Sequence, residues 1–124
     1  IYKRISGCGS GTEYLAVTPT GELYPCHQFV GNKDYLMGDI WQGVTRTDTR
    51  DKFKRCNAYS RKECDDCWAR LYCSGGCAAN AYNATGDING VYSYGCDLFK
   101  KRIECAVALQ IGASLSTDSH TSCD

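Results

Sequence analysis

Four cysteines stand close together in the middle of the chain, and their thiols are the groups best suited to chemistry. Cys64, Cys67, Cys73 and Cys77 follow the spacing Cys-x2-Cys-x5-Cys-x3-Cys. Two thiolates three positions apart on a loop can point at one metal centre. They are poor disulfide partners for each other outside redox motifs, and disulfide frameworks usually close longer loops. The spacing therefore favours metal ligation.

A wider pattern includes most of the remaining cysteines. Cys8 is followed by twelve residues, then Gly21, four residues and Cys26. After the central group, eighteen residues lead to Cys96. Seven of the ten cysteines thus form one ordered motif that also contains a glycine.

The elements that must position these cysteines are short. Residues 13–26 read as a β-hairpin, because strand-like residues flank the turn sequence Pro19-Thr20-Gly21. A further strand is predicted over 35–40. Within 43–59 the sequence predicts a helix, with Thr47 and Asp48 as possible N-caps.

The second half of the chain is predicted to be helical outside its cysteine loop. Residues 63–74 form this loop, 76–84 a short helix ended by Gly86, and 97–111 the clearest helix. Residues 112–124 are expected to be a flexible polar tail, which leaves 1–111 as the structured domain. The fold class is therefore α+β: an N-terminal hairpin, Cys-rich loops and C-terminal helices wrapped around metal.

Composition excludes several classes of protein. The chain has 124 residues, with 14 basic and 14 acidic side chains and no Lys/Arg run longer than three residues. This balance argues against binding to nucleic acid or to a membrane surface, and no apolar stretch is long enough to span a bilayer. The core has few aliphatic residues, so a domain of this size needs bound metal or another cross-link.

The ordered motif closely resembles the SPASM domain, the C-terminal module of many radical S-adenosylmethionine enzymes that modify ribosomally made peptides. The resemblance covers roughly residues 8–109, and all seven motif cysteines match. The stretches CGSGTEYLAVTPTGELYPCHQFVG, YLMGDI and CWARLYCSGGCAANAYNATGDI are most similar to maturases of "six cysteines in forty-five residues" peptides.

The resemblance implies a function for the parent enzyme and for this module. The parent would install thioether crosslinks in a Cys-rich precursor peptide, and this domain would carry two auxiliary 4Fe–4S clusters for substrate engagement, electron transfer or both. Its partners would be the N-terminal radical domain of the same enzyme and the precursor peptide, in the cytoplasm.

The same resemblance implies two ligand sets. Cys64, Cys67, Cys73 and Cys96 would hold the cluster farther from the radical site, and this set also follows the spacing of iron–sulfur proteins. Cys8, Cys26 and Cys77 would hold the nearer cluster. Ser74-Gly75-Gly76 would then have to turn the chain between Cys73 and Cys77.

The nearer cluster has only three cysteines, because residues 1–7 contain none. Its fourth iron would take His27, Cys56, solvent or a substrate thiol. Cys56 lies in a predicted helix, and His27 is expected to point away. We therefore expect an open iron site that a cysteine of the substrate can occupy.

The catalytic machinery of a radical enzyme is missing from this sequence. Such enzymes hold the catalytic cluster with Cys-x3-Cys-x2-Cys, a spacing that does not occur here. We expect no S-adenosylmethionine binding and no catalytic residue in this chain alone, which would be part of an enzyme without being one.

Several residues outside the motif have simpler expected roles. Cys105, on the apolar face of the last helix with Leu98 and Leu109, is expected to be buried, while Cys123 and His120 belong to the tail. Arg61, Lys62 and Arg70 either compensate cluster charge or are ordinary solvated charges.

Two other functions stay open. Cys-x2-Cys pairs also suit tetrahedral zinc, so a structural or interaction module with zinc is the main alternative, and zinc can also replace clusters in protein produced in air. A secreted disulfide protein is the third. Anaerobically prepared protein should be brown if it holds clusters and colourless in the other two cases.

Overall fold

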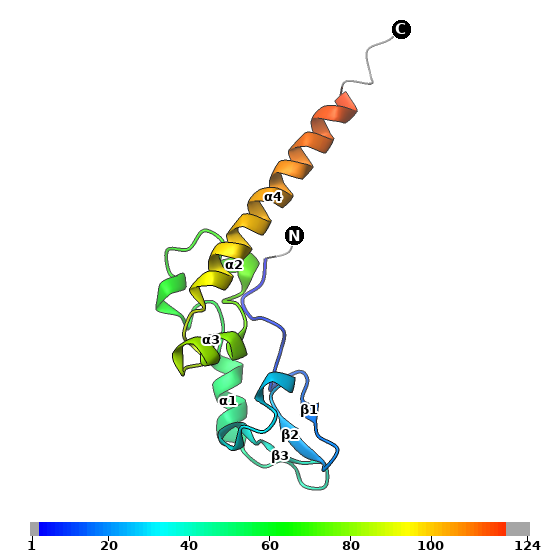
Figure 1. Cartoon of the computed structure of the whole chain (residues 1–124), viewed down its shortest axis with the longest axis vertical. Coiled ribbons are helices and arrows are strands. Elements are labelled where there is room, and N and C mark those ends of the chain that lie inside the picture. The colour runs from blue at the N-terminus through cyan, green and yellow to red at the C-terminus, as the bar shows by residue number, and fades with distance from the viewer. Residues whose placement is uncertain (1–2, 119–124) are drawn as a thin grey trace. The chain divides into compact units, whose positions relative to one another are not determined.

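A computed structural model describes residues 3–118, with side chains through Leu115. The chain divides into two compact units, Ile1–Tyr92 and Ser93–Asp124. Figure 1 shows the first as a small sheet followed by three helices, and the second as one helix. This arrangement confirms the predicted α+β class.

The sheet has four short antiparallel strands in the order β1-β2-β3-β4. These are β1 (Ala16–Val17), β2 (Glu22–Tyr24), β3 (Gly38–Asp39) and β4 (Gly43–Val44). Ala16 pairs with Tyr24, so the predicted hairpin over 13–26 is confirmed. Strand β4 was not predicted.

The strand predicted over 35–40 is shorter than expected. Lys33–Tyr35 forms a 3-10 turn, in which the Asn32 side chain accepts a hydrogen bond from the Asp34 backbone N–H. Only Gly38–Asp39 pairs as a strand. A side-chain cap of this kind competes with extended structure, so the strand begins only at Gly38.

The helices of the first unit are short. They are α1 (Thr47–Arg55), α2 (Arg70–Cys73) and α3 (Ala78–Thr85). Two 3-10 turns, His27–Phe29 and Lys62–Cys64, lie beside cysteines. The helices predicted within 43–59 and 76–84 are present. The N-cap of α1 is Arg46, not the predicted Thr47 or Asp48, and no side chain caps this end. Gly86 ends α3 in the left-handed conformation.

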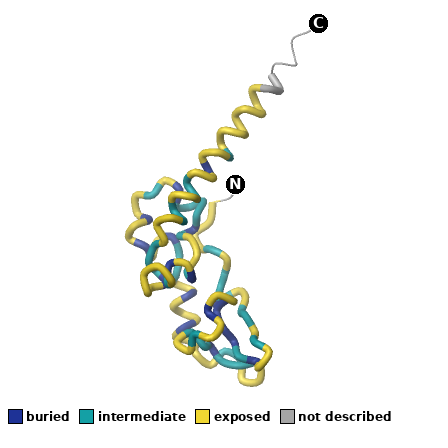
Figure 2. The backbone as a smooth tube through the Cα atoms, viewed as in Figure 1, coloured by how far each residue is buried: buried dark blue, intermediate teal, exposed yellow. Residues whose placement is uncertain are grey.

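The core of the first unit joins the sheet to α1 and α3. Its buried residues are Tyr24, Cys26, Phe29, Phe53, Ala79 and Ile88. Phe29 meets the ring of Phe53 edge-on, with centroids 5.4 Å apart. Figure 2 shows buried positions in β2 and along one side of α1, and further ones in the loops and in α3. Aromatic rings therefore supply much of the packing that the few aliphatic residues cannot.

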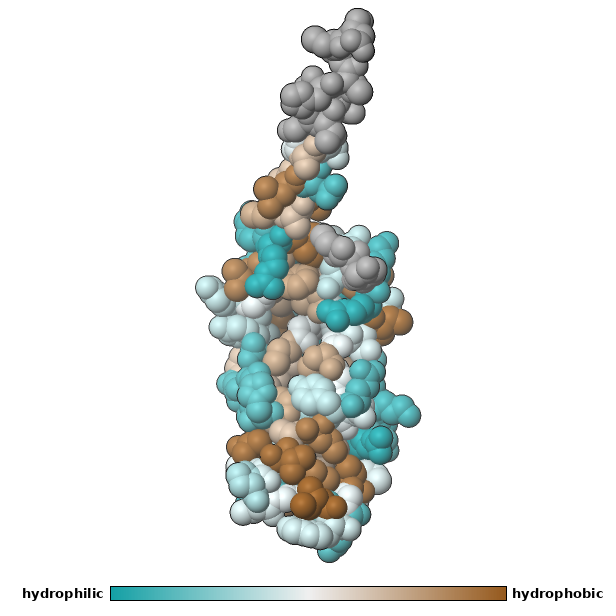
Figure 3. Space-filling model, turned by 90° about the vertical axis from the view of Figure 1, so that its right-hand side faces the viewer, coloured by the Kyte–Doolittle hydropathy of each residue, from teal (hydrophilic) through white to brown (hydrophobic). Residues whose placement is uncertain are grey.

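Apolar side chains also stay exposed at the sheet. Val17, Ile40 and Trp41 are all more than half exposed. Figure 3 shows apolar residues gathered over the strands.

The second unit is helix α4 (Ser93–Asp118), which begins before and ends after the predicted 97–111. It continues through Gly112, where a tail was predicted, because one glycine costs a helix only about 1 kcal/mol. The prediction that Cys105 is buried was wrong: Cys105 is exposed, as are Leu98 and Leu109, whereas Ile103 on the same helix is buried. Cys123 and His120 lie outside the described residues. No helix in the described part of the chain is long and apolar enough to cross a membrane.

Candidate metal centre

Three segments that are distant in the sequence meet around Cys8, Cys26 and Cys77. The Gly11 N–H donates to the Pro25 carbonyl at 2.9 Å, which ties the loop after Cys8 to the residue before Cys26. An ideal Cβ on Gly7 would lie 3.6 Å from the Gly76 carbonyl oxygen, so the residue before Cys8 passes the residue before Cys77. The backbone thus brings the segments that carry all three thiols together.

Side chains connect the same three segments. The Gln28 Nε2 donates to Cys77 Sγ at 3.7 Å, and the Tyr14 hydroxyl lies 3.9 Å from Cys8 Sγ. Burial, the contact with Cys8 and the negative charges of Cys8, Cys26 and Cys77 raise the pKa of Tyr14 to about 12. All three predicted ligands of the nearer cluster therefore affect the pKa of the same tyrosine.

The sulfur atoms are placed among hydrogen-bond donors. Burial opposes ionisation of Cys8, but hydrogen bonds from Ser10 and Tyr14 outweigh it and lower the pKa of the thiol. Burial raises the pKa of Cys26, with the Cys77 and Cys8 charges adding to it, while the backbone N–H groups of Gln28 and Phe29 act in the opposite direction.

This set of thiols and donors fits an iron–sulfur cluster. Such clusters are held by thiolates, and hydrogen bonds to the sulfurs set their properties. The donors here lie on both sides: Ser10 and Tyr14 reach Cys8, and Gln28 reaches Cys77.

The predicted turn between Cys73 and Cys77 is present. Ser74, Gly75 and Gly76 have φ angles of 60°, 83° and 79°, three consecutive left-handed residues. Two glycines adopt this conformation without steric cost, whereas most residues resist it. The chain therefore ends α2 at Cys73 and begins α3 directly after Cys77.

The glycine of the motif has a packing reason. Gly21 has a φ of 84°, and an ideal Cβ there would lie 2.8 Å from the Trp41 ring. Trp41 thus lies over the hairpin turn that leads into β2 and on to Cys26. Any larger residue would be strained and would also displace the indole.

The second predicted ligand set is divided between the two units. Cys64 is buried at the end of the 3-10 turn Lys62–Cys64, and the Cys67 N–H donates to its carbonyl at 3.2 Å. Cys73 ends α2. Cys96 belongs to α4 in the second unit. The first three thus follow one another on a tightly turned segment.

Cys56 and His27 differ in their surroundings. His27 is exposed. Cys56 caps the C-terminus of α1, where its thiol donates to the Ile88 carbonyl at 3.3 Å and accepts from Arg61 Nη2 at 3.3 Å. Burial raises the pKa of Cys56, although the Arg61 charge opposes this. Both sides of this thiol are occupied within the protein.

The three basic residues around the loop differ in exposure. Arg61 is only 2% exposed, so it is not an ordinary solvated charge. Lys62 is exposed. Arg70 packs over the Tyr59 ring at 4.6 Å and lies 4.0 Å from a carboxylate oxygen of Asp65.

The described residues contain no group of three His, Cys, Asp or Glu side chains arranged to hold a single metal ion. The thiols of Cys8, Cys26, Cys67 and Cys77 form no disulfide bond.

Sequence reasoning missed Tyr14, Gln28 and Ser74 as neighbours of the ligands. Tyr14 follows Cys8 within the same loop, and Gln28 follows Cys26 by two positions. Their closeness to ligand positions was the available signal. Polar residues are common in such loops, so the signal was weak.

Comparison with known proteins adds to this geometry. Residues 8–68 match the family model of SPASM, an iron–sulfur cluster-binding domain. This match and the cysteine motif support an auxiliary cluster domain of the kind found in radical S-adenosylmethionine enzymes that modify peptides.

A particular relative is the PqqA peptide cyclase of Methylorubrum populi. The two are 30% identical over 94 aligned positions, and the match covers 69% of this chain and 23% of the cyclase. The chain therefore spans about a quarter of the length of this relative.

Proposed function

We propose that this chain is an auxiliary domain with two 4Fe–4S clusters, belonging to a radical S-adenosylmethionine enzyme that crosslinks a peptide. Cys8, Cys26 and Cys77 hold the nearer cluster. The farther cluster is held by the second set: Cys64, Cys67, Cys73 and Cys96.

The contacts that bring the segments of Cys8, Cys26 and Cys77 together carry this proposal. Three thiols from distant segments share one electrostatic environment, in which their ionised forms repel one another. A cationic iron cluster relieves that repulsion. The donors from Ser10, Tyr14 and Gln28 then have thiolate sulfurs to bind.

When bound, such clusters supply electron transfer or a coordination position for a substrate atom. The three cysteines of the nearer site differ in their exposure to solvent. Cys26 lies in the core, 5% exposed, so water is excluded on that side. Cys8 and Cys77 are exposed, which leaves the other side accessible to a peptide.

The fourth iron of the nearer cluster is proposed to be open to the substrate. The Cys56 thiol already donates to Ile88 and accepts from Arg61. His27, though next to Cys26, is exposed. A thiol of a Cys-rich peptide would suit the free position.

The proposed reaction of the parent enzyme is thioether formation in a ribosomally made Cys-rich peptide in the cytoplasm. Its basis is the resemblance of residues 8–31 and 67–88 to maturases of that kind. The cyclase that matches this chain is named for a peptide, which supports a peptide substrate. The radical domain of the same enzyme would be the partner.

Anaerobic reconstitution followed by iron, sulfide and zinc analysis tests the proposal. Brown protein with about eight irons and eight sulfides per chain, and EPR signals from two reduced clusters, is the expected result. Colourless protein that binds zinc and no iron under the same conditions would instead establish the zinc module.

A further inference from the structure

Arg61 is a buried cation that the proposed function does not use. It is 2% exposed, although it lies directly before the 3-10 turn Lys62–Cys64 in an irregular part of the chain. Within the part of the chain that the structure describes, no carboxylate forms an ion pair with it. A buried charge is costly unless an opposite charge lies nearby, because its desolvation is otherwise not compensated. The burial of Arg61 therefore calls for negative charge close to the guanidinium.

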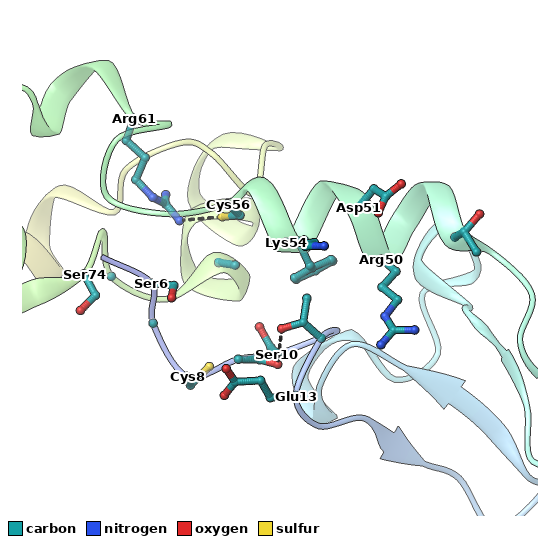
Figure 4. A pocket seen from close by; sticks show the side chains of 17 residues that line it. Ser6, Cys8, Ser10, Glu13, Arg50, Asp51, Lys54, Cys56, Arg61 and Ser74 are labelled. Atoms are coloured by element: carbon teal, nitrogen blue, oxygen red, sulfur yellow. Dashed lines mark hydrogen bonds between the residues drawn. The ribbon is translucent and has the colours of Figure 1, made fainter. Parts of the chain in front are cut away.

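The hydrogen bonds of this guanidinium fix its orientation without neutralising it. Nη1 donates to the Gly90 carbonyl, and Nη2 donates to Cys56 Sγ at 3.3 Å. Figure 4 shows the side chain of Arg61 turned toward Cys56. The Cys56 thiol itself donates to the Ile88 carbonyl, so neither acceptor of Arg61 is an anion. The side chain is thus held in place while its charge stays uncompensated.

The turn between two proposed ligands packs against the same side chain. An ideal Cβ on Gly75 would lie 2.9 Å from Arg61 Nε and 3.2 Å from its Cδ, so the backbone of Gly75 covers this part of Arg61. Gly75 is two positions from Cys73 and two from Cys77, which belong to different ligand sets. The Cys64 N–H also donates to the Arg61 carbonyl at 2.9 Å. Arg61 therefore lies beside segments that carry ligands of both sets.

Bound clusters would supply the missing negative charge. A 4Fe–4S core held by three or four thiolates is a net anion, because the ligands carry more charge than the core. An added electron makes this charge more negative, so a nearby cation stabilises the reduced form and raises the reduction potential. Because Arg61 is removed from water, salt screens its charge less than that of an exposed residue.

We propose that Arg61 is a positioning residue shared by the two clusters. Its side chain supports the turn between Cys73 and Cys77, and its buried charge raises the reduction potentials of both clusters. The proposal rests on the proposed function for the presence of the clusters. It adds to the seven cysteines a residue outside their motif.

Potentiometric EPR titration of the anaerobically reconstituted chain tests this role. Arg61→Met removes the charge and keeps a long side chain, whereas Arg61→Lys keeps the charge. Arg61→Met should shift the reduction equilibrium of both clusters toward the oxidised form by about tenfold, which is about 59 mV for one electron. Arg61→Lys should recover most of this shift. The matched control is Lys62→Met, which removes an exposed charge at the next position and should shift either equilibrium less than about threefold.

Several outcomes would overturn the proposal. Equal shifts in Arg61→Met and Lys62→Met would remove the special role of the buried charge. A shift confined to one cluster would contradict the shared role, and an Arg61→Lys variant with potentials as low as those of Arg61→Met would refute the role of charge.

Iron content decides the case in which Arg61→Met does not assemble clusters. Iron binding by Arg61→Lys would then support a requirement for positive charge at this position, and iron loss from both variants would refute it. Failure of the unchanged chain to bind iron would refute the proposed function instead.

Discussion

The amide of Gln28 donates a hydrogen bond to the thiol of Cys77, 49 positions away, at 3.7 Å. Gln28 follows Cys26 on the 3-10 turn His27–Phe29, so this bond joins the segments of two predicted ligands. Hydrogen bonds to cluster sulfurs stabilise the more negative, reduced state.

Gln28→Ala should therefore lower the reduction potential of the nearer cluster. The loss of about 1 kcal/mol corresponds to roughly 40 mV for one electron. Potentiometric EPR titration measures the shift, and Gln42→Ala, at an exposed turn of the sheet, is the matched control. If both variants shift the potential equally, Gln28 does not tune the cluster.

Gly21→Ala should destabilise the domain more than Gly31→Ala. Both glycines have similar φ angles, 84° and 89°, so both alanines pay a conformational cost of about 1–2 kcal/mol. A Cβ added to Gly21 would lie 2.8 Å from the Trp41 ring, whereas a Cβ added to Gly31 would have nothing within 4 Å. Trp41 is 76% exposed and its ring can shift, so the extra crowding adds less than a clash in a packed core, about 1 kcal/mol. Unfolding midpoints of the two holo variants measure the difference, and identical midpoints would contradict the role given to Trp41.

Cys67→Ala should abolish one cluster and leave the other partly intact, whereas Cys105→Ala should retain nearly all the iron. Cys67 lies in the turn after Cys64, and Cys105 is exposed on α4. Iron and sulfide analysis with EPR distinguishes the two clusters. Similar iron loss from both variants would remove the basis for the farther ligand set.

Removal of the clusters should abolish cooperative thermal unfolding. Much of the core consists of a few aromatic rings and Cys26, so ligation must contribute free energy that packing does not supply. Calorimetry before and after anaerobic chelation tests this. A sharp, unchanged transition in the apo protein would show that the polypeptide alone carries the fold.

A Cys-containing substrate peptide should perturb the EPR signal of one cluster only. The reason is the open iron proposed beside Cys8, Cys26 and Cys77. The matching Cys→Ser peptide should leave both signals unchanged. Binding of a fourth protein side chain to that iron would contradict the open site, and the full parent enzyme should be tested alongside this chain.

The cysteine spacing by itself favoured a metal site over disulfides, because ligand geometry restricts how closely thiols can follow one another, but it left iron–sulfur and zinc both open. Local signals were also sufficient for the hairpin before Cys26 and the end of α3 at Gly86, whereas the turn through Gly75 and Gly76 was expected from the resemblance. Each depends on residues that are near one another in the sequence, where turn chemistry and capping act.

Only the tertiary structure decided what surrounds the thiols. The exposure of Cys105 contradicts the helical periodicity, because an apolar stripe is buried only where another element covers it. The burial of Arg61 and its bond to Cys56 depend on how the segments after α1 and α3 come together. The contacts of Tyr14 with Cys8 and of Gln28 with Cys77 likewise arise from packing, which no local pattern of charge or spacing encodes.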